Sequence, residues 1–264
     1  MFYYFGYGSN INMISLRAKG VEPLQSVKAK LPGWRLRFNV QHWFRHEGGM
    51  GNIEPSDRPT DQVEGVVHLC QDADLVSLDL MESYGAAYDR VEVEVDTASG
   101  PTKALAYVGL PDFIDDSCLP TSRYLNIILK GAKAAGLSKS YIRDLERHEL
   151  LPDYDYPIFQ PPAGEFPNYS ATTLAAHASL TALWGFVFDM GKARPKLQVI
   201  AKLFGGKDMT LFFLKRHDTS TGTETLEEIK KGQISEPGKR YLNAYLNEYA
   251  KEFEYAGKYS FDTV

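Results

Sequence analysis

The stretch Phe2-Tyr3-Tyr4-Phe5-Gly6-Tyr7-Gly8-Ser9-Asn10 carries the strongest structural signal in the chain. Its first four residues are apolar and aromatic, which is the composition of a buried strand. The glycines and short polar residues after Phe5 favour a tight turn. Residues 11–16, Ile-Asn-Met-Ile-Ser-Leu, look helical. The segment therefore predicts a strand, a tight turn and a helix start, with Ser9 or Asn10 as the helix N-cap.

A turn of this kind, between a strand and a helix, can hold an anion. The backbone N–H groups of Gly6 to Asn10 would be unpaired, and the positive end of a helix would lie behind them. Glycine lacks a Cβ atom, so a ligand can approach the backbone closely. The turn therefore predicts either a cradle for a carboxylate or a developing oxyanion, or an ordinary turn with a helix cap.

A second candidate is the acid at the end of Leu75-Val76-Ser77-Leu78-Asp79-Leu80-Met81-Glu82. On a helix, Glu82 would point between the directions of Leu75 and Leu78. Desolvation beside leucines would raise the pKa of Glu82, making it a better proton acceptor near neutral pH, and Asp79 would act in the same direction. The alternative is a solvated glutamate at a helix end. Tyr84 and Tyr88 then form either a substrate wall with hydroxyl donors or simple packing.

Other motifs argue against metal or nucleotide chemistry. His42 and His46 are four residues apart, but the surrounding sequence does not favour a helix and no third ligand is evident. We therefore predict no metal site. His68, His148, His177 and His217 are isolated, which is typical of surface or hydrogen-bonded core residues. A G-x-S-x-G elbow, a P-loop and a dinucleotide fingerprint are absent from the sequence.

The wider pattern predicts an α+β fold with two domains. Residues 1–151 form a small mixed β-barrel with flanking helices. Its other strands are expected at 33–40, 63–69, 90–95 and 104–108, and its helices at 73–84, 121–135 and 139–147. Residues 152–170 contain five prolines and form an ordered linker. Residues 171–264 form a smaller α+β unit of unknown role, with strands at 183–188 and 209–214 and helices at 226–231 and 239–255.

Composition narrows the class of protein. The 264 residues are 44% hydrophobic and 24% charged, with a net charge of −5. These values fit a globular protein, and no basic stripe suggests a nucleic-acid partner. The start of the chain lacks the pattern of a signal peptide, and no stretch is apolar enough to span a membrane. Cys70 and Cys118 are expected to be two reduced thiols rather than a disulfide, so the cytoplasm is the expected location.

Several of these residues occur in an order that resembles the γ-glutamylcyclotransferase family. The resemblance covers roughly residues 1–150. It begins with Tyr4 to Asn10, continues through Val63-Glu64-Gly65-Val66-Val67, and includes Leu78-Asp79-x-x-Glu82 with Tyr88 six residues later. It ends with Gly131-Ala132-Lys133, Gly136-Leu137 and Tyr141. Each motif alone is weak, but the ordered set is specific. Ser83 departs from the family pattern, in which glycine often follows the acid.

The resemblance implies a β-barrel enzyme that needs no cofactor and acts on a small γ-glutamyl compound. The catalytic acid maps onto Glu82. The family's substrate loop maps onto Tyr4, Phe5, Gly6, Tyr7, Gly8 and Ser9, with Asn10 adjoining, and a pocket tyrosine maps onto Tyr107. Together with Tyr88, these are the predicted substrate-binding residues. Pairing of the chain as a homodimer is left open.

The expected reaction converts a γ-glutamyl amide into 5-oxoproline and a free amine. Glu82 accepts a proton from the α-ammonium, whose nitrogen attacks the γ-carbonyl, and later returns a proton to the departing amine. Two alternatives remain. The leaving group could be an amine, a protein side chain or another metabolite, or the barrel could be a binding module that has lost the reaction. Retention of both Glu82 and the loop argues against the second alternative.

Overall fold

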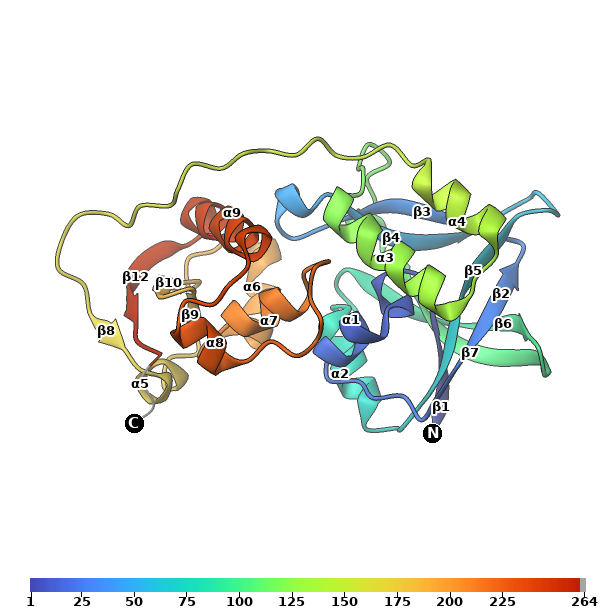
Figure 1. Ribbon diagram of the computed structural model, residues 1–264, viewed down its shortest axis with the longest axis horizontal. Coiled ribbons are helices and arrows are strands. Elements are labelled where there is room, and N and C mark those ends of the chain that lie inside the picture. The colour runs from blue at the N-terminus through green and yellow to red at the C-terminus, as the bar shows by residue number, and fades with distance from the viewer. Residues whose placement is uncertain (262–264) are drawn as a thin grey trace. The chain divides into compact units, whose positions relative to one another are not determined.

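A computed structural model describes residues 1–261 of the chain, shown in Figure 1. The chain divides into two compact units, Met1–Asp153 and Tyr154–Val264. In the described part, no helix combines the length and apolarity needed to cross a membrane. Cys70 and Cys118 are free thiols, the first buried and the second half-buried.

The first unit is a closed barrel with flanking helices, as predicted. Five strands follow one another around it in the order β1-β5-β2-β6-β7, and β3 and β4 form a separate two-stranded sheet. The elements of this unit are β1 (Phe2–Gly6), η1 (Ser9–Ile11), α1 (Met13–Ala18), β2 (Gln25–Pro32), β3 (Trp34–Gln41), η2 (Arg45–Glu47), β4 (Gly49–Pro55), β5 (Gln62–Cys70), α2 (Asp74–Met81), β6 (Tyr88–Thr97), β7 (Gly100–Gly109), η3 (Pro111–Phe113), α3 (Ser122–Ala135) and α4 (Lys139–Glu146). Of these strands, β2 and β4 are not among those predicted.

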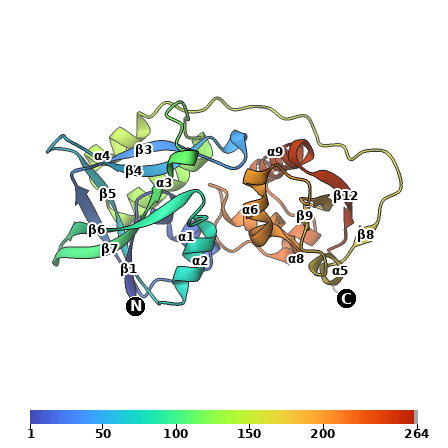
Figure 2. The same cartoon turned by 180° about the vertical axis from the view of Figure 1, so that it is seen from behind.

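The first strand separates two hydrophobic clusters because its side chains alternate between two faces. Phe5 packs inside the barrel with residues such as Val67 and Ala106. Tyr4 faces the other way, into a cluster that includes Leu16 of α1 and Leu78 of α2. Figures 1 and 2 show α1 and α2 lying side by side next to the barrel. The alternation of β1 thus places Tyr4 beside the helix that ends at the predicted catalytic acid.

Helix α3 packs closely on the turn that follows β1. A Cβ atom at Gly131 of α3 would lie 2.6 Å from the backbone nitrogen of Asn12, so only glycine fits there. Asn12 also donates a hydrogen bond from Nδ2 to the backbone oxygen of Ile127, at 3.2 Å. The glycine in the Gly131-Ala132-Lys133 motif therefore positions the helix against the predicted substrate loop.

We predict that residues 1–153 fold without the rest of the chain. The three buried hydrophobic clusters of this unit are built entirely from its own residues. A chain ending at Asp153 should unfold in one cooperative transition when followed by circular dichroism in urea. A protein ending at Leu137, which removes α4, is the control that should lose this cooperativity. A non-cooperative transition in the longer chain would show that the predicted domain division is wrong.

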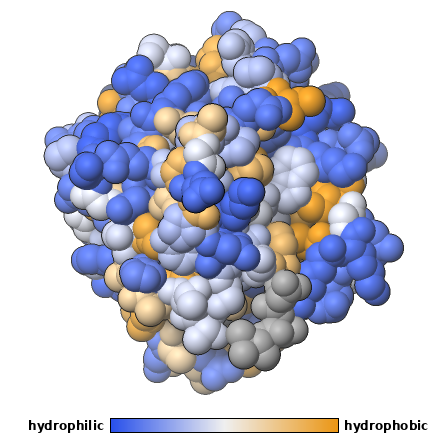
Figure 3. All heavy atoms as spheres, turned by 90° about the vertical axis from the view of Figure 1, so that its left-hand side faces the viewer, coloured by the Kyte–Doolittle hydropathy of each residue, from blue (hydrophilic) through white to orange (hydrophobic). Residues whose placement is uncertain are grey.

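The second unit contains a five-stranded sheet in the order β11-β9-β10-β12-β8, with helices around it. Its elements are β8 (Asn168–Tyr169), α5 (Ala171–Ala175), β9 (Leu180–Leu183), β10 (Phe186–Asp189), α6 (Pro195–Phe204), β11 (Lys207–Asp208), α7 (Thr210–Lys215), α8 (Leu226–Lys230), α9 (Glu236–Glu252) and β12 (Glu254–Tyr259). Figure 3 shows one face of the molecule, on the side of β8 and β12 in Figure 1. Hydrophilic residues predominate there, and hydrophobic ones form scattered patches.

Three sequence predictions in this unit are wrong. The predicted strand 183–188 is a hairpin, because the chain turns at Trp184 and Gly185, which both have positive φ. The predicted strand 209–214 is a helix, α7, because a short apolar run does not distinguish the two structures. The helix predicted at 239–255 begins earlier, at Glu236 after the N-cap Ser235, and its last predicted residues belong to β12.

The proline-rich segment lies along α9 of its own unit. Tyr156 donates a hydrogen bond to Glu248 at 2.6 Å, and the backbone N–H of Phe159 donates to the side chain of Asn243 at 2.8 Å. Asn247 donates to the backbone oxygen of Pro157 at 3.0 Å. Side chains of α9 therefore hold this segment through hydrogen bonds. Its prolines contribute only carbonyl acceptors, because proline has no backbone N–H group.

Candidate active site

The strand, turn and helix predicted at the start of the chain are present, but the helix has a different cap. The turn passes through η1 before α1 begins. The N-cap of α1 is Asn12, whose Oδ1 accepts a hydrogen bond from the backbone nitrogen of Ile14 at 2.9 Å. The prediction of Ser9 or Asn10 as the cap of this helix is wrong. The side chain of Asn10 is instead hydrogen-bonded to Tyr4 and Glu82, which lie outside this helix.

Asn10 links the first strand to the predicted catalytic acid. It is only 4% exposed, and its Nδ2 donates to Tyr4 Oη at 2.6 Å and to Glu82 Oε1 at 2.9 Å. Its Oδ1 is buried and has no hydrogen-bond partner among residues 1–261. A buried acceptor of this kind requires a donor, because an unmet hydrogen bond costs about 1–3 kcal/mol. Asn10 thus carries an unsatisfied acceptor on the same amide whose Nδ2 contacts Glu82.

Glu82 is the C-cap of α2, and its side chain is only 15% exposed. Its Oε1 lies 2.9 Å from Nζ of Lys19, the C-cap of α1, whose side chain is 4% exposed. Desolvation by leucines was the sequence expectation for this acid. The structure adds a cation, the Lys19 ammonium, as an ion-pair partner of the carboxylate. Sequence analysis missed Lys19, because 63 residues separate it from Glu82.

A second acid–tyrosine pair lies next to the first. Tyr107 of β7 donates a hydrogen bond to Asp79 Oδ1 at 2.7 Å, and its ring meets that of Tyr4 edge-on with centroids 5.9 Å apart. Burial, and then the hydrogen bond to Asp79, raise the pKa of Tyr107 far above its usual value. Asp79 Oδ2 also lies 3.5 Å from Arg90. Asp79 therefore contacts both the Tyr107 hydroxyl and the Arg90 guanidinium, and the Tyr107 ring lies beside that of Tyr4.

Three buried tyrosines converge on Gly51 of β4. Tyr88 donates to the backbone oxygen of Gly51 at 2.8 Å, and Tyr124 accepts from its backbone nitrogen at 3.0 Å. Tyr7 donates to the backbone oxygen of Tyr107 and lies 3.5 Å from the Gly51 oxygen. The hydroxyl of Tyr88 thus holds β4 in place. Gly51 and Tyr124 were missed by sequence analysis, although the glycine-rich passage at 48–51 is a signal for a close backbone approach.

The remaining predicted residues of the loop have different environments. Phe5 lies in the barrel core and is fully buried, so only its backbone is left for a substrate. A Cβ atom at Gly6 would lie 3.1 Å from the backbone oxygen of Asn10, and one at Gly8 would lie 3.0 Å from Tyr124 Oη. Tyr84 is 43% exposed and stacks under the guanidinium of Arg90. Tyr84 is therefore set apart from the buried tyrosines.

His68 of β5 contacts the backbone of the loop at Asn10. It is fully buried, its Nε2 lies 3.0 Å from the backbone oxygen of Asn10, and its Nδ1 lies 2.8 Å from Ser26 Oγ. A neutral ring with the proton on Nε2 satisfies both contacts, because Ser26 can then donate to Nδ1. Burial lowers the pKa of His68 to about 4. The ring therefore fixes the loop residue whose side chain contacts Glu82.

We predict that His68 makes the protein less stable to unfolding as the pH falls from about 6.5 to about 4. Its folded pKa of about 4 lies below the ordinary value of about 6.5, so the unfolded chain binds the proton first. The lost free energy of unfolding is about 1.4 kcal/mol per pH unit, or roughly 3 kcal/mol over the window. Urea unfolding at a series of pH values measures it.

The matched variants for this prediction are His68→Gln and His177→Gln. Glutamine does not titrate, so His68→Gln should flatten the acid side of the stability profile. His177 is exposed, and its replacement should leave the slope unchanged. An identical slope in wild type and His68→Gln would contradict the prediction.

The residues around Glu82 are suited to one kind of chemistry, which is proton transfer. It combines a mostly buried carboxylate, a buried amide acceptor beside it and a glycine-containing loop, enclosed by tyrosines. Residues 1–261 contain no group of three His, Cys, Asp or Glu side chains placed to hold a metal ion. A mostly buried carboxylate with a second acceptor on a neighbouring side chain suits the capture and deprotonation of an ammonium group.

Comparisons with known proteins agree with this fold. A family model described as the AIG2-like family matches residues 62–145. The γ-glutamylcyclotransferase of Mus musculus is 30% identical over 152 residues, which cover 56% of this chain and 79% of that protein. The γ-glutamyl cyclotransferase gliK of Claviceps purpurea is 28% identical over 159 residues, covering 57% of this chain and 68% of that protein. A solved γ-glutamyl cyclotransferase structure, 27% identical, superposes with a TM-score of 0.50 over 60% of this chain and 94% of that one.

The fold and these relatives define a cyclotransferase barrel, and the predicted fold class is confirmed. The chain belongs to the γ-glutamylcyclotransferase family. The resemblance inferred from the order of the motifs is thereby confirmed for a segment of the chain.

Proposed function

We propose that this chain converts a γ-glutamyl amide into 5-oxoproline and a free amine, with Glu82 as general acid and base. The observation that carries the proposal is the contact between the mostly buried Glu82 carboxylate and the side chain of Asn10. Cyclotransferase activity follows from the family, and the substrate and the residue roles are the proposal.

The substrate ammonium binds at the Glu82 carboxylate, the proposed proton acceptor. Asn10 Nδ2 orients this carboxylate through a hydrogen bond of 2.9 Å, and Oδ1 of the same amide is a further buried acceptor without a donor. Lys19 Nζ lies 2.9 Å from Glu82 Oε1 and forms an ion pair with this carboxylate. Tyr4, Tyr7, Tyr88 and Tyr107 enclose the position, and the backbone of Gly6 to Ser9 binds either the α-carboxylate or the tetrahedral oxyanion.

The proton balance of the reaction requires a base that later acts as an acid. The substrate ammonium has three protons, of which one stays on the nitrogen of the new ring. The α-nitrogen attacks the γ-carbonyl carbon, the bond from that carbon to the leaving nitrogen breaks, and the other two protons end on the departing amine. Glu82 carries these two protons in turn, one before and one after the attack, from the first nitrogen to the second.

Ring closure itself needs orientation more than a strong nucleophile. The attacking nitrogen is tethered to the carbonyl it attacks, and the product ring has five members. Good orientation can supply roughly 7–11 kcal/mol of the barrier in such intramolecular reactions. The buried tyrosines and the glycine-containing loop would hold the folded conformer and exclude water.

A panel of γ-glutamyl compounds tests the proposal. γ-Glutamylalanine, glutathione, a γ-glutamyl alkylamine and ε-(γ-glutamyl)lysine differ in the leaving amine, and α-glutamylalanine is the control with the wrong linkage. We expect 5-oxoproline, detected by chromatography, from at least one γ-linked compound and none from the control. Absence of product from every γ-linked compound would contradict the proposal and favour a binding module.

One further member of the panel separates the two roles of the loop. A 4-aminobutanoyl amide lacks the α-carboxylate but can still close a five-membered ring. If the Gly6 to Ser9 backbone binds the α-carboxylate, the KM for this compound should be much higher than the KM for the corresponding γ-glutamyl amide. If the backbone stabilises the oxyanion, the two compounds should have similar KM values and similar kcat values.

A further inference from the structure

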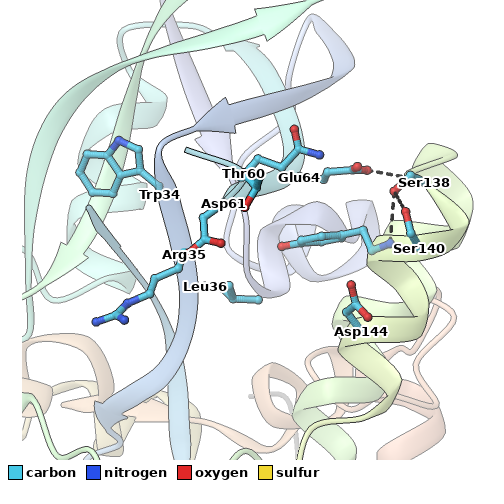
Figure 4. A pocket seen from close by; sticks show the side chains of 11 residues that line it. Trp34, Arg35, Leu36, Thr60, Asp61, Glu64, Ser138, Ser140 and Asp144 are labelled. Atoms are coloured by element: carbon cyan, nitrogen blue, oxygen red, sulfur yellow. Dashed lines mark hydrogen bonds between the residues drawn. The ribbon is translucent and has the colours of Figure 1, made fainter. Parts of the chain in front are cut away.

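A cavity lies in the first unit, apart from Glu82 and the residues that contact it. It has a volume of about 330 Å³ and opens between the start of β3, the chain leading into β5, and α4 (Figure 4). This volume is at the lower end of the usual range for small-molecule sites, about 300–1,000 Å³. The cavity is lined by Trp34, Arg35, Leu36, Thr60, Asp61, Gln62, Glu64, Ser138, Ser140, Tyr141 and Asp144.

The apolar part of the lining continues the barrel core. Trp34, Leu36 and Tyr141 pack against the cluster that fills the barrel interior. Two aromatic rings and an aliphatic side chain thus line one small cavity. Aromatic faces attract both the apolar body of a ligand and a cation placed over them.

The charged part of the lining has an excess of acids. Asp61, Glu64 and Asp144 line the cavity, and the single cationic side chain there is Arg35. Arg35 is already engaged, because its guanidinium lies 3.0 Å from Glu54 on the neighbouring strand. Figure 4 shows Asp61 across the cavity from Ser138 and Asp144. Asp144 pairs with Arg147 at 3.5 Å at the surface. The lining acids still outnumber the lining cation, which opposes an anion and favours a cation.

Glu64 is the least expected of these acids, because its side chain is only 4% exposed. Its Oε2 accepts a hydrogen bond from the backbone nitrogen of Ser138 at 2.8 Å, which Figure 4 shows. Its Oε1 lies 3.7 Å from Nζ of Lys30, a side chain that is half exposed. One carboxylate oxygen is thus only weakly compensated, and a buried carboxylate is costly unless it is paired.

Tyr141 is a buried polar group without a partner in this cavity. Its hydroxyl is buried and makes no hydrogen bond with any residue from 1 to 261. The backbone of Glu64 lies near it, outside hydrogen-bonding geometry. A buried hydroxyl that lines a cavity and lacks a partner is a position where a ligand group can bind.

We propose that this cavity binds a small organic ammonium compound, a protonated primary amine carried on an aromatic or aliphatic body. The ammonium donates to the carboxylates of Asp61 and Glu64 and to the hydroxyl oxygen of Tyr141. The body of the ligand packs on Trp34 and Leu36. The site is independent of the proposed function, because none of its lining residues is Glu82 or a residue that contacts it.

Three probes of similar shape and different charge test the site on the full chain. They are phenethylammonium, the neutral 2-phenylethanol and the anionic 3-phenylpropionate. The chain has three tryptophans, so the indole N–H signals of protein labelled with ¹⁵N-tryptophan are easily separated, and Trp34→Phe assigns the signal of Trp34. We expect saturable movement of the Trp34 signal with phenethylammonium, and binding of the other two probes that is about 10-fold weaker or more.

Variants then locate the ammonium. Asp61→Asn and Glu64→Gln should each weaken phenethylammonium binding about 10-fold or more, because each removes a charged hydrogen-bond acceptor. Tyr141→Phe should weaken it less, and Asp96→Asn, an exposed acid elsewhere in the unit, should leave it unchanged. If Glu64→Gln fails to fold, Asp61→Asn alone decides. Equal binding of all three probes, tighter binding of 3-phenylpropionate, or no movement of the Trp34 signal would overturn the proposal.

Discussion

Glu82→Gln is expected to lower the release of 5-oxoproline from a γ-glutamyl compound by at least about 100-fold. General acid–base catalysis contributes roughly 10²–10⁴-fold in enzymes that use it, and glutamine cannot accept the proton. The substitution keeps the shape of the side chain and an oxygen for the hydrogen bond from Asn10, so the loop should stay in place. Product formation is measured by chromatography and the fold by circular dichroism.

Two controls separate lost chemistry from lost structure. Glu92→Gln removes an acid that forms an exposed pair with Lys103, and it should leave activity unchanged. The double variant Lys19→Met/Glu82→Gln removes both charges of the buried pair, so it should fold well and still be inactive. Activity near the wild-type level in Glu82→Gln would remove Glu82 from its proposed role.

Lys19→Met is expected to cost the protein a large part of its stability. The substitution leaves the Glu82 carboxylate mostly buried without its cation. Breaking a buried ion pair by removing one partner typically costs 3–5 kcal/mol, and the 15% exposure of Glu82 places the expected value at about 3 kcal/mol. Urea unfolding followed by circular dichroism measures the free energy of unfolding.

The double-mutant cycle is the sharpest form of this experiment. Lys19→Met/Glu82→Gln should recover most of the stability lost by Lys19→Met, because no unpaired charge remains. Lys103→Met breaks the exposed pair with Glu92 and should cost less than about 1 kcal/mol. Additive effects of the two buried substitutions would mean that the pair is not coupled in solution.

Lys19→Met also reports on the proposed mechanism through its pH profile. Without the neighbouring ammonium, the Glu82 carboxylate is protonated more easily. The acidic limb of the kcat/KM profile should therefore move to higher pH in a variant that still folds. A variant that only destabilised the fold would lower kcat/KM at every pH, and the acidic limb of the profile would stay at the same pH.

Local patterns accounted for most of the barrel but for less of the second unit. The alternation in residues 90–95 and 104–108 located β6 and β7, because side chains of a half-buried strand alternate between core and solvent. The short apolar run 209–214 did not reveal α7, because a buried helix and a buried strand have the same composition over six residues. The hairpin at Trp184 was missed because a tryptophan with positive φ is rare.

Some residues of the candidate site could likewise be predicted from the sequence, and others could not. The order of the motifs placed Glu82, Tyr4, Asn10 and Tyr107 in one family pattern, and the structure brings these four side chains together. The pattern said nothing of Lys19, Tyr124 or the backbone of Gly51. Each of them meets the site through a contact between residues far apart in the chain, and such contacts leave no periodic signal in the sequence.

The sequence by itself determined the strand, turn and helix at the start of the chain, the position of the acid after the second helix, and the family. These depend on residue type and spacing over short distances, where steric and hydrophobic preferences act directly. Only the tertiary structure decided that the acid has a buried lysine beside it, that Asn10 holds the loop to the acid instead of capping a helix, and that a histidine supports the loop from a neighbouring strand. Closing the barrel and packing the helices on it bring these groups within bonding distance, and burial then gives their charges and hydrogen bonds their strength.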